Sequence, residues 1–282
     1  MIQAKLNLFP SDFRHDGRFP IRLDVPQPPP PEDRPLTEIH DARALQAGDE
    51  TMAFFEAHGF VLLPHATAVT DWNADPKDGY MAEVEGLIRA HLLPERRLVI
   101  PPFGTIVRRG EGTGNGYAGG VHQDCGIGVD DYQAMIAGFA NAESAAMWRA
   151  YFDNPDVERY LLIDFWRTTN MPGPLRHMPL ALCDPNTVEP GDIVPTDIHG
   201  VAPGGQSVPQ MAMRRNPGQA WYYYPGMTGD EVLAFKLFDC AKANPRAMRS
   251  CFHTAFADPT TPIDAAPRQS CEFRVGVFVL KD

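Results

Sequence analysis

The chain ends with the stretch SCEFRVGVFVL, residues 270–280, and its alternating pattern decides the fold class. Successive side chains of a β-strand point to opposite faces. Ser270, Glu272 and Arg274 therefore share one face of the predicted strand, while the residues between them are mostly apolar. This pattern predicts a strand that lines a polar cavity, although taken alone it is also typical of the wet side of an edge strand.

The rest of the chain also favours strands. The 28 prolines and 24 glycines exceed what a helical bundle tolerates, because proline removes a backbone donor and glycine weakens a helix interior. Outward from the last strand, we predict strands at 59–66, 97–108, 160–169 and 251–258, and helices at 49–58, 80–91 and 130–155. Residues 228–239 are left open, because Thr228 with Glu231 has the spacing of a helix capping box while the following residues alternate like a strand.

The 282 residues can bury one core, so we predict a single domain at 37–282 preceded by a proline-rich arm at 1–36. The run VPQPPPPEDRP at 25–35 favours an extended polyproline conformation. Such an arm could reach a neighbouring subunit, so a homodimer is one assembly that the sequence allows. Residues 109–120 are rich in glycine and are predicted to form a mobile loop.

Composition excludes several classes of partner. A formal net charge of −11 opposes binding to nucleic acid or to an anionic membrane surface. No apolar run approaches the roughly 20 residues that span a bilayer, and the N-terminus lacks the apolar stretch of a signal peptide. The five cysteines are odd in number and contain no C-x-x-C motif, which fits a reducing cytoplasm better than a disulfide framework or a structural zinc site.

The motif VHQD at 121–124 is the first candidate for chemistry. In extended backbone, His122 and Asp124 project from the same face and can meet one metal ion. Two histidines and one carboxylate form a facial triad that leaves Fe(II) positions open for a 2-oxo acid and O2. An isolated H-x-D motif occurs often by chance, so a second histidine is required.

Nine histidines are available, and His253 is the preferred second ligand. It lies in the predicted strand at 251–258 and precedes a suitable arginine, whereas His177 is the main rival. That arginine is Arg268, whose guanidinium matches the geometry of a carboxylate, and the hydroxyl of Ser270 points to the same face. Both side chains fit the distal carboxylate of 2-oxoglutarate.

Several motifs in one order resemble a known family. They are IHDAR at 39–43, GFVLLPHATAVTDW at 59–72, VHQD, FWRTTN at 165–170, MPLALCD at 178–184, WYYYPGMTGDEVLAFKLFD at 221–239, FHTAFADP at 252–259 and PRQSCEFR at 267–274. The chain is similar to the Fe(II)/2-oxoglutarate-dependent oxygenase-like family of secondary metabolism, with its AsaB-, CmcJ- and NvfI-type and gibberellin desaturase-like members.

The resemblance implies a mainly β fold with flanking helices around a double-stranded β-helix, the cupin-like jelly roll. It carries the catalytic and metal-ligand roles to His122, Asp124 and His253, and implies Fe(II), 2-oxoglutarate and O2 as cofactors. Arg274 and Arg167 stand in family motifs too, so with Arg268 and Ser270 they are candidates for binding the cosubstrate. The implied reaction is hydroxylation or desaturation of a C–H bond in a small secondary metabolite.

Three other classes of function were weighed. Gly114, Gly116 and Gly119 match the dinucleotide fingerprint of a nucleotide-cofactor oxidoreductase, but the VHQDCGIG that follows is a poor helix start. A serine hydrolase is weaker, because the chain has no G-x-S-x-G. The non-enzyme alternative is an accessory or ligand-binding barrel, against which the intact H-x-D and the distal histidine argue.

Overall fold

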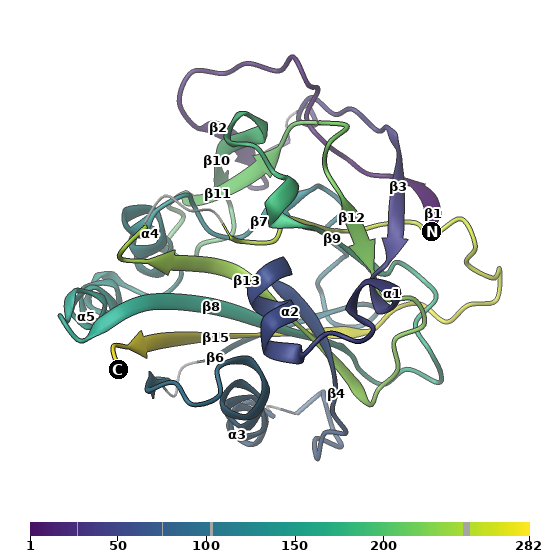
Figure 1. Cartoon of the computed structure of the whole chain (residues 1–282). Helices are drawn as coiled ribbons and strands as arrows, with labels where there is room; N and C mark the ends of the chain where they lie inside the picture. Colours follow the sequence, from purple (N-terminus) through teal and green to yellow (C-terminus); the bar gives the residue numbers. More distant parts are fainter. Residues whose placement is uncertain (27, 75, 102–103, 245–248) are drawn as a thin grey trace.

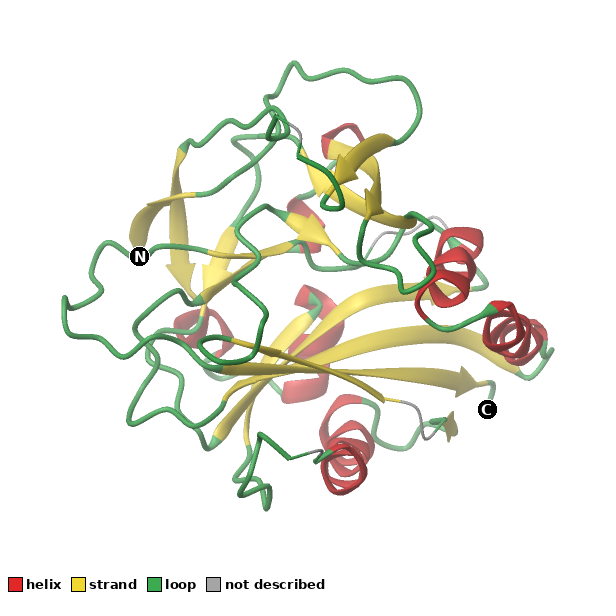
Figure 2. Ribbon diagram, turned by 180° about the vertical axis from the view of Figure 1, so that it is seen from behind, coloured by secondary structure: helices red, strands yellow, loops and turns green. Residues whose placement is uncertain are grey.

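Two β-sheets face each other, with the helices outside them, in a computed structural model that describes residues 1–26, 28–74, 76–101, 104–244 and 249–282 (Figures 1 and 2). The expectation of a mainly β fold with flanking helices is confirmed. Among the described residues, no helix combines the length and the apolar character needed to cross a bilayer.

The first sheet has nine strands, drawn in the upper half of Figure 1. In spatial order they are β1 (Ile2–Lys5), β3 (Leu36–Asp41), β12 (Trp221–Tyr223), β9 (Leu180–Cys183), β14 (His253–Ala255), β7 (His122–Gln123), β11 (Val208–Met213), β10 (Ile193–His199) and β2 (Phe19–Arg22). Neighbours are antiparallel except β3 with β12 and β10 with β2. Strands distant in the sequence are thus brought side by side at its centre.

The second sheet is antiparallel throughout and contains the longest strands. Its order is β4 (Phe60–Pro64), β13 (Glu231–Ala241), β8 (Val157–Thr168), β15 (Ser270–Leu280) and β5 (Leu98–Val99), with β6 (Gly104–Arg109) also paired to β15. Strand β8 lies between two neighbours and is buried along most of its length. The predicted strand at 270–280 is confirmed.

The register of β8 with β15 divides their side chains between two faces. Thr168 pairs with Ser270, Trp166 with Glu272, and Asp164 with Arg274, so these six lie on one face. That face looks toward the nine-stranded sheet, because Arg274 contacts Asp124 there. Phe273 lies on the opposite face, where its ring packs 5.2 Å from that of Tyr80 in α3.

Helices cover the sheets from outside. They are α1 (Ala42–Gln46), α2 (Thr51–His58), α3 (Lys77–Leu87) with the π-helical turn η1 (Ile88–Leu92), α4 (Val129–Phe139), α5 (Ala142–Asp153) and the 3₁₀ turns η2 (Pro185–Thr187) and η3 (Pro190–Asp192). The predicted helix at 130–155 is divided into two, because Asn141 interrupts it and caps α5 through its side-chain oxygen. Helix α2 ends at Gly59, whose φ of 75° is a left-handed cap.

Two sequence predictions are resolved or refined by the packing. The undecided segment is strand β13, because its residues are buried on both faces between β4 and β8. The Thr228 amide still donates to Glu231 Oε2 at 2.9 Å, so the contact expected of a helix cap instead closes the turn before the strand. The predicted strand at 97–108 is seen as β5 and β6, and residues 102–103 of that prediction lie outside the described residues.

The first 36 residues contribute two short strands, β1 and β2, at opposite edges of the nine-stranded sheet. Within the proline run, Asp33 forms a bridge with Leu8, and Gln27 lies outside the described residues. The segment we predicted as an arm is thus attached to the sheet at both ends. The division of the chain at residue 36 stays a prediction.

Candidate metal centre

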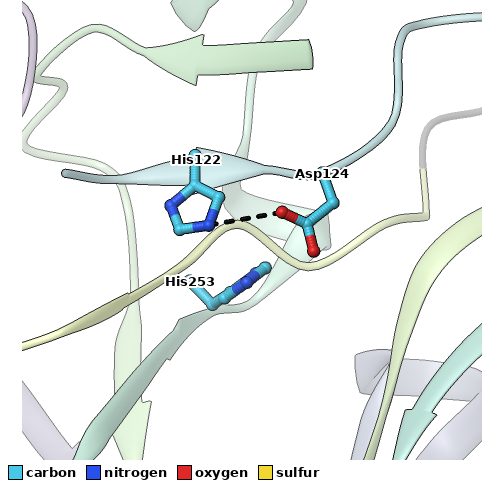
Figure 3. A group of neighbouring side chains, drawn as sticks. All are labelled: His122, Asp124 and His253. Atoms are coloured by element: carbon cyan, nitrogen blue, oxygen red, sulfur yellow. Dashed lines mark ion pairs between the residues drawn. The ribbon is translucent and has the colours of Figure 1, made fainter. Parts of the chain in front are cut away.

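His122, Asp124 and His253 converge on one point of the nine-stranded sheet (Figure 3). His122 begins β7, Asp124 follows that strand, and His253 begins the adjacent strand β14. The ladder pairs His122 directly with His253, which places their rings 4.5 Å apart between centroids. One ligand atom from each of the three residues lies within 4.8 Å of the others.

Both imidazoles are oriented by the backbone. Nδ1 of His122 donates to the carbonyl of Gly120 at 2.7 Å, and Nδ1 of His253 donates to the carbonyl of Cys251 at 3.2 Å. Each ring therefore carries its proton on Nδ1 and leaves Nε2 with a free lone pair. A metal-binding histidine typically has this arrangement, so the residues fit a bound ion.

Asp124 is held from two sides. Its Oδ1 lies 3.4 Å from Nε2 of His122, and its Oδ2 lies 2.8 Å from Nη2 of Arg274. The contact with Arg274 is a close ion pair without the alignment of a hydrogen bond. One oxygen of the carboxylate therefore faces the histidines while the other faces an arginine.

The charges at the triad follow from burial and from this pairing. Burial would raise the pKa of Asp124, but Arg274 and His122 outweigh it and hold the carboxyl pKa well below its usual range. Burial lowers the pKa of His253 to about 4, with His122 adding to the effect. The pKa of His122 is raised, because Asp124 outweighs burial there. An anionic carboxylate beside a neutral imidazole is the protonation state that a cation requires.

The cosubstrate candidates Arg268 and Ser270 lie at the start of β15. Arg268 is 1% exposed, and its guanidinium lies between two rings, 4.3 Å from the centroid of Tyr117 and 5.5 Å from that of Trp166. Its Nη1 donates to the carbonyl of Met178, yet Nε of Arg268 and Oγ of Ser270 have no hydrogen-bond partner in the described part of the chain. Burial lowers the pKa of Arg268 to about 10.

The neighbouring strand β8 adds further polar atoms without hydrogen-bond partners in the described structure, on the same face of the sheet as Ser270. Thr168 Oγ1, Trp166 Nε1 and Asp164 Oδ1 on β8 are buried and lack partners among the described residues. Buried polar groups are normally paired, so a run of unpaired ones on a single face fits a polar ligand. Sequence reasoning missed Thr168 and Asp164, although the alternation in YLLIDFWRTT was a usable signal once β8 was placed beside β15.

The other two arginines lie elsewhere. Nη1 of Arg167 lies 3.1 Å from Nδ1 of His65, and its Nη2 donates to the carbonyls of His65 and Gly229, so the structure does not bring Arg167 to the triad. It pairs with Cys271 across the ladder, on the face opposite Arg268. Arg274 does reach the triad, but it contacts the candidate ligand Asp124 and lies within β15, whereas Arg268 precedes that strand.

Two further sequence alternatives are placed away from the triad. His177 accepts the backbone N–H of Arg268 at 3.3 Å and is not part of the three-residue group. The Gly114 to Gly119 fingerprint lies in the loop between β6 and β7 and leads into a strand, whereas dinucleotide binding requires that it open a helix.

One hollow of the described surface lies away from the triad. It has a volume of about 590 Å³ and lies beside the glycine-rich loop, lined by Asn73, Arg108, Glu111, Gly112, Thr113, Asn170 and Gln269. This hollow is open and polar, and no triad residue lines it. The candidate ligand atoms converge at the triad and not in this hollow.

The chain is similar to several curated proteins that are named hydroxylase/desaturase. The hydroxylase/desaturase asaB of Aspergillus flavus is 31% identical over 43% of this chain and 56% of its own length. The hydroxylase/desaturase CTB9 of Cercospora beticola is 28% identical over 83% of this chain and 74% of its own. The chain spans about half the length of several other curated relatives that it matches.

The fold has a close counterpart among solved structures. A structure of the iron and alpha-ketoglutarate-dependent endoperoxidase NvfI superposes with a TM-score of 0.73, at 21% identity, over 99% of this chain and 98% of that one. The expected jelly-roll fold is thereby confirmed. A family model described as "Oxidoreductase/YMDC permease-like domain" matches residues 25–278. The chain belongs to this oxidoreductase family, and its resemblance to the 2-oxoglutarate oxygenase-like proteins of secondary metabolism is confirmed.

Proposed function

We propose that the protein is an Fe(II)/2-oxoglutarate-dependent oxygenase that oxidises a C–H bond, by hydroxylation or desaturation, in a small secondary metabolite. The observation that carries the proposal is the convergence of His122, Asp124 and His253, with the Nδ1 atom of each imidazole bound to a backbone carbonyl and its Nε2 atom on the side of the other two residues. The names of the relatives support the same reaction class.

In this proposal the three side chains hold Fe(II) from one side and leave its other positions open. When bound, the iron with 2-oxoglutarate and O2 supplies the oxidising chemistry, in which decarboxylation of the cosubstrate to succinate accompanies oxidation of the substrate. The protein itself orients the metal-binding side chains and excludes water from the site. The backbone carbonyls of Gly120 and Cys251 orient the imidazole rings of His122 and His253 by accepting their Nδ1 protons.

Arg268, with Ser270, is proposed to bind the distal carboxylate of 2-oxoglutarate. A guanidinium offers two parallel hydrogen bonds to a carboxylate, and the unpartnered Nε of Arg268 remains available. Ser270 and Thr168 lie opposite each other in the ladder, and neither hydroxyl has a hydrogen-bond partner among the described residues. Together they supply donors for an anionic group in a buried place.

The glycine-rich loop at 110–120 is proposed to shield this site. Tyr117 from the loop covers the guanidinium of Arg268 and donates its hydroxyl to the Arg268 carbonyl at 2.7 Å. A closed loop keeps water from the reacting groups. We place the protein in the cytoplasm, where its five unpaired and buried cysteines stay reduced.

The proposal is tested by anaerobic titration of the protein with Fe(II) and 2-oxoglutarate, following the visible charge-transfer band of the chelate. We expect a band in the wild-type protein and its loss in His122→Ala and His253→Ala. His177→Ala is the matched control and should keep the band. A wild-type protein without the band, or a band that persists in both triad variants, would refute the proposal.

A further inference from the structure

A chain of ion pairs connects the glycine-rich loop to the candidate metal ligand Asp124. Nη2 of Arg274 lies 2.8 Å from Oδ2 of Asp124 and also 2.8 Å from Oε2 of Glu272. The other oxygen of Glu272 accepts from Nε of Arg109 at 2.5 Å. Nη1 of Arg109 then donates to the carbonyl of Gly116 in the loop at 3.0 Å. We call Arg109, Glu272 and Arg274 the relay.

The relay is sheltered from solvent, so its charges act strongly on one another. The side chains of Glu272 and Arg274 are 11% and 20% exposed, and that of Arg109 is 21% exposed. Charges that are largely removed from water are weakly screened. Each member contacts the next directly, which means that displacing one changes the surroundings of its neighbour.

The three residues come from strands that the fold brings together at one place. Arg109 ends β6 and pairs with Ser270, while Glu272 and Arg274 follow on the same face of β15. The loop begins immediately after Arg109, at Gly110, where φ is 128° and a Cβ would lie 2.5 Å from the carbonyl of Arg268. The start of the loop is therefore fixed against β15 beside the relay.

We propose that the relay couples the seating of the loop to the orientation of Asp124, with Arg274 as the positioning residue. This inference rests on the proposed function. Arg274 occupies Oδ2, which leaves Oδ1 as the oxygen that faces the histidines. Glu272 fixes Arg274 in that position, and Arg109 joins Glu272 to the loop carbonyl. Asp124 is thus restricted to binding a metal through one oxygen while the loop is seated.

Coupling between two sites is reciprocal, so metal binding must also affect the loop. A cation bound at Oδ1 draws charge from Asp124 and so weakens its attraction for Arg274. The ion pair of Arg274 with Glu272 changes in strength as a result, and so does the ion pair of Glu272 with Arg109. In the intact relay, the metal-bound protein should hold the loop more firmly. A broken relay should bind metal without this effect on the loop.

The experiment uses Co(II) alone as the probe, with two readouts on the purified full chain. Hydrogen–deuterium exchange of residues 110–120 reports the loop, and the Co(II) d–d absorption reports the coordination number. In the wild type we expect Co(II) to slow exchange of the loop at least threefold. In Glu272→Gln and Arg109→Met the slowing should disappear while Co(II) still binds.

Arg274→Met should additionally weaken the d–d absorption, because Asp124 is then free to bind through both oxygens and raise the coordination number. Arg274→Lys is the conservative variant. One nitrogen, Nη2 of Arg274, contacts both carboxylates, so an ammonium that reaches the same point should keep the wild-type behaviour in both readouts. Arg43→Met is the control. It removes an ion pair that includes no residue of the triad or the relay, in which Nη1 of Arg43 lies 2.7 Å from Oε1 of Glu231. It should behave like the wild type in both readouts.

The two proposals fail in distinguishable ways. A wild-type protein that binds no Co(II) overturns the proposed function. A protein that binds Co(II) with no change of loop exchange, or with equal slowing in Arg109→Met and the wild type, overturns the relay alone. If Arg274→Met does not fold, as judged by circular dichroism, Glu272→Gln and Arg109→Met carry the test.

Discussion

The guanidinium of Arg268 lies beneath the ring of Tyr117, 4.3 Å from its centroid, while the hydroxyl of that tyrosine donates to the carbonyl of the same arginine. Trp166 approaches the guanidinium at 5.5 Å. The arginine is thus fixed by rings from two different segments, and no carboxylate pairs with it among the described residues. A buried cation arranged in this way is suited to an anion from outside the chain.

Arg268→Met is expected to weaken 2-oxoglutarate binding roughly 100-fold or more, because two charge-assisted hydrogen bonds are lost at about 1.5–3 kcal/mol each. The free energy of unfolding should stay the same or rise, since the change removes an unpaired buried cation. Isothermal titration with 2-oxoglutarate in the presence of Mn(II) measures the affinity. Arg167→Met serves as the comparison, and an equal loss of affinity there would contradict the assignment.

Ser270→Ala and Thr168→Val remove two hydroxyls that have no protein partner in the described structure. Each is expected to lower the 2-oxoglutarate affinity by about 1.5–3 kcal/mol, or roughly 10- to 150-fold, if it donates to the charged carboxylate. Stability should not fall, because no hydrogen bond within the chain is broken. Urea denaturation measures the second effect, and a destabilised Ser270→Ala protein with normal affinity would show that the hydroxyl is structural.

The buried cluster around Asp239 should make the fold sensitive to acid. Burial would raise the pKa of Asp239, but Arg159, at 2.6 Å, and Lys236 outweigh it and lower the pKa below 3.8. A lowered folded-state pKa contributes stability that is complete above about pH 5 and is lost as the pH falls through 3.8 toward the folded-state value. The free energy of unfolding should therefore fall steeply below pH 5.

Asp239→Asn should reduce the dependence of that free energy on pH while costing about 3–5 kcal/mol at pH 7, because Lys236 is left buried with one fewer counter-charge. Asp153→Asn is the matched control. It removes an exposed ion pair with Arg149, so the free energy of unfolding should depend on pH as it does in the wild type. Urea denaturation at pH 7 and pH 3 measures the difference, and an equal fall in the free energy of unfolding in Asp239→Asn and the wild type would refute the prediction.

Gly276 on β15 is predicted to tolerate no side chain. A Cβ there would lie 2.4 Å from the hydroxyl oxygen of Tyr160, which is buried. Gly276→Ala should cost about 1–3 kcal/mol in the free energy of unfolding through overpacking. Gly86 is exposed near the end of α3 with open space around it, so Gly86→Ala should instead stabilise by about 0.5–1 kcal/mol. Thermal denaturation of the two variants should shift in opposite directions.

The sequence predicted the long strands β8 and β15 well, because their hydrophobic patterns are local. The alternation of residues 270–280 and the extended backbone of the H-x-D motif both appear in the structure. Residues 228–239 could not be assigned from sequence, because Thr228 and Glu231 have the spacing of a helix cap while the residues after them alternate like a strand. The pairing of β1 and β2 at the sheet edges was missed, since four-residue strands carry too little pattern to be recognised.

Within the site, the sequence identified the residue types and the structure supplied their neighbours. His253 was chosen among nine histidines, and the ladder places it opposite His122. Arg268 and Arg274 share a face in any strand, so periodicity alone does not reveal that one lies beneath Tyr117 and the other beside Asp124. Such distinctions arise from segments far apart in the sequence and depend on tertiary contacts.

The ladder between β7 and β14 also has a consequence for how the protein matures. It joins residues 122 and 253, so the chain must close a very long loop before both histidines can share one ion. Contacts between residues so distant in sequence form late and slowly as a chain folds. Before this ladder forms, the chain brings together only His122 and Asp124, so the complete three-residue group exists only in the folded protein.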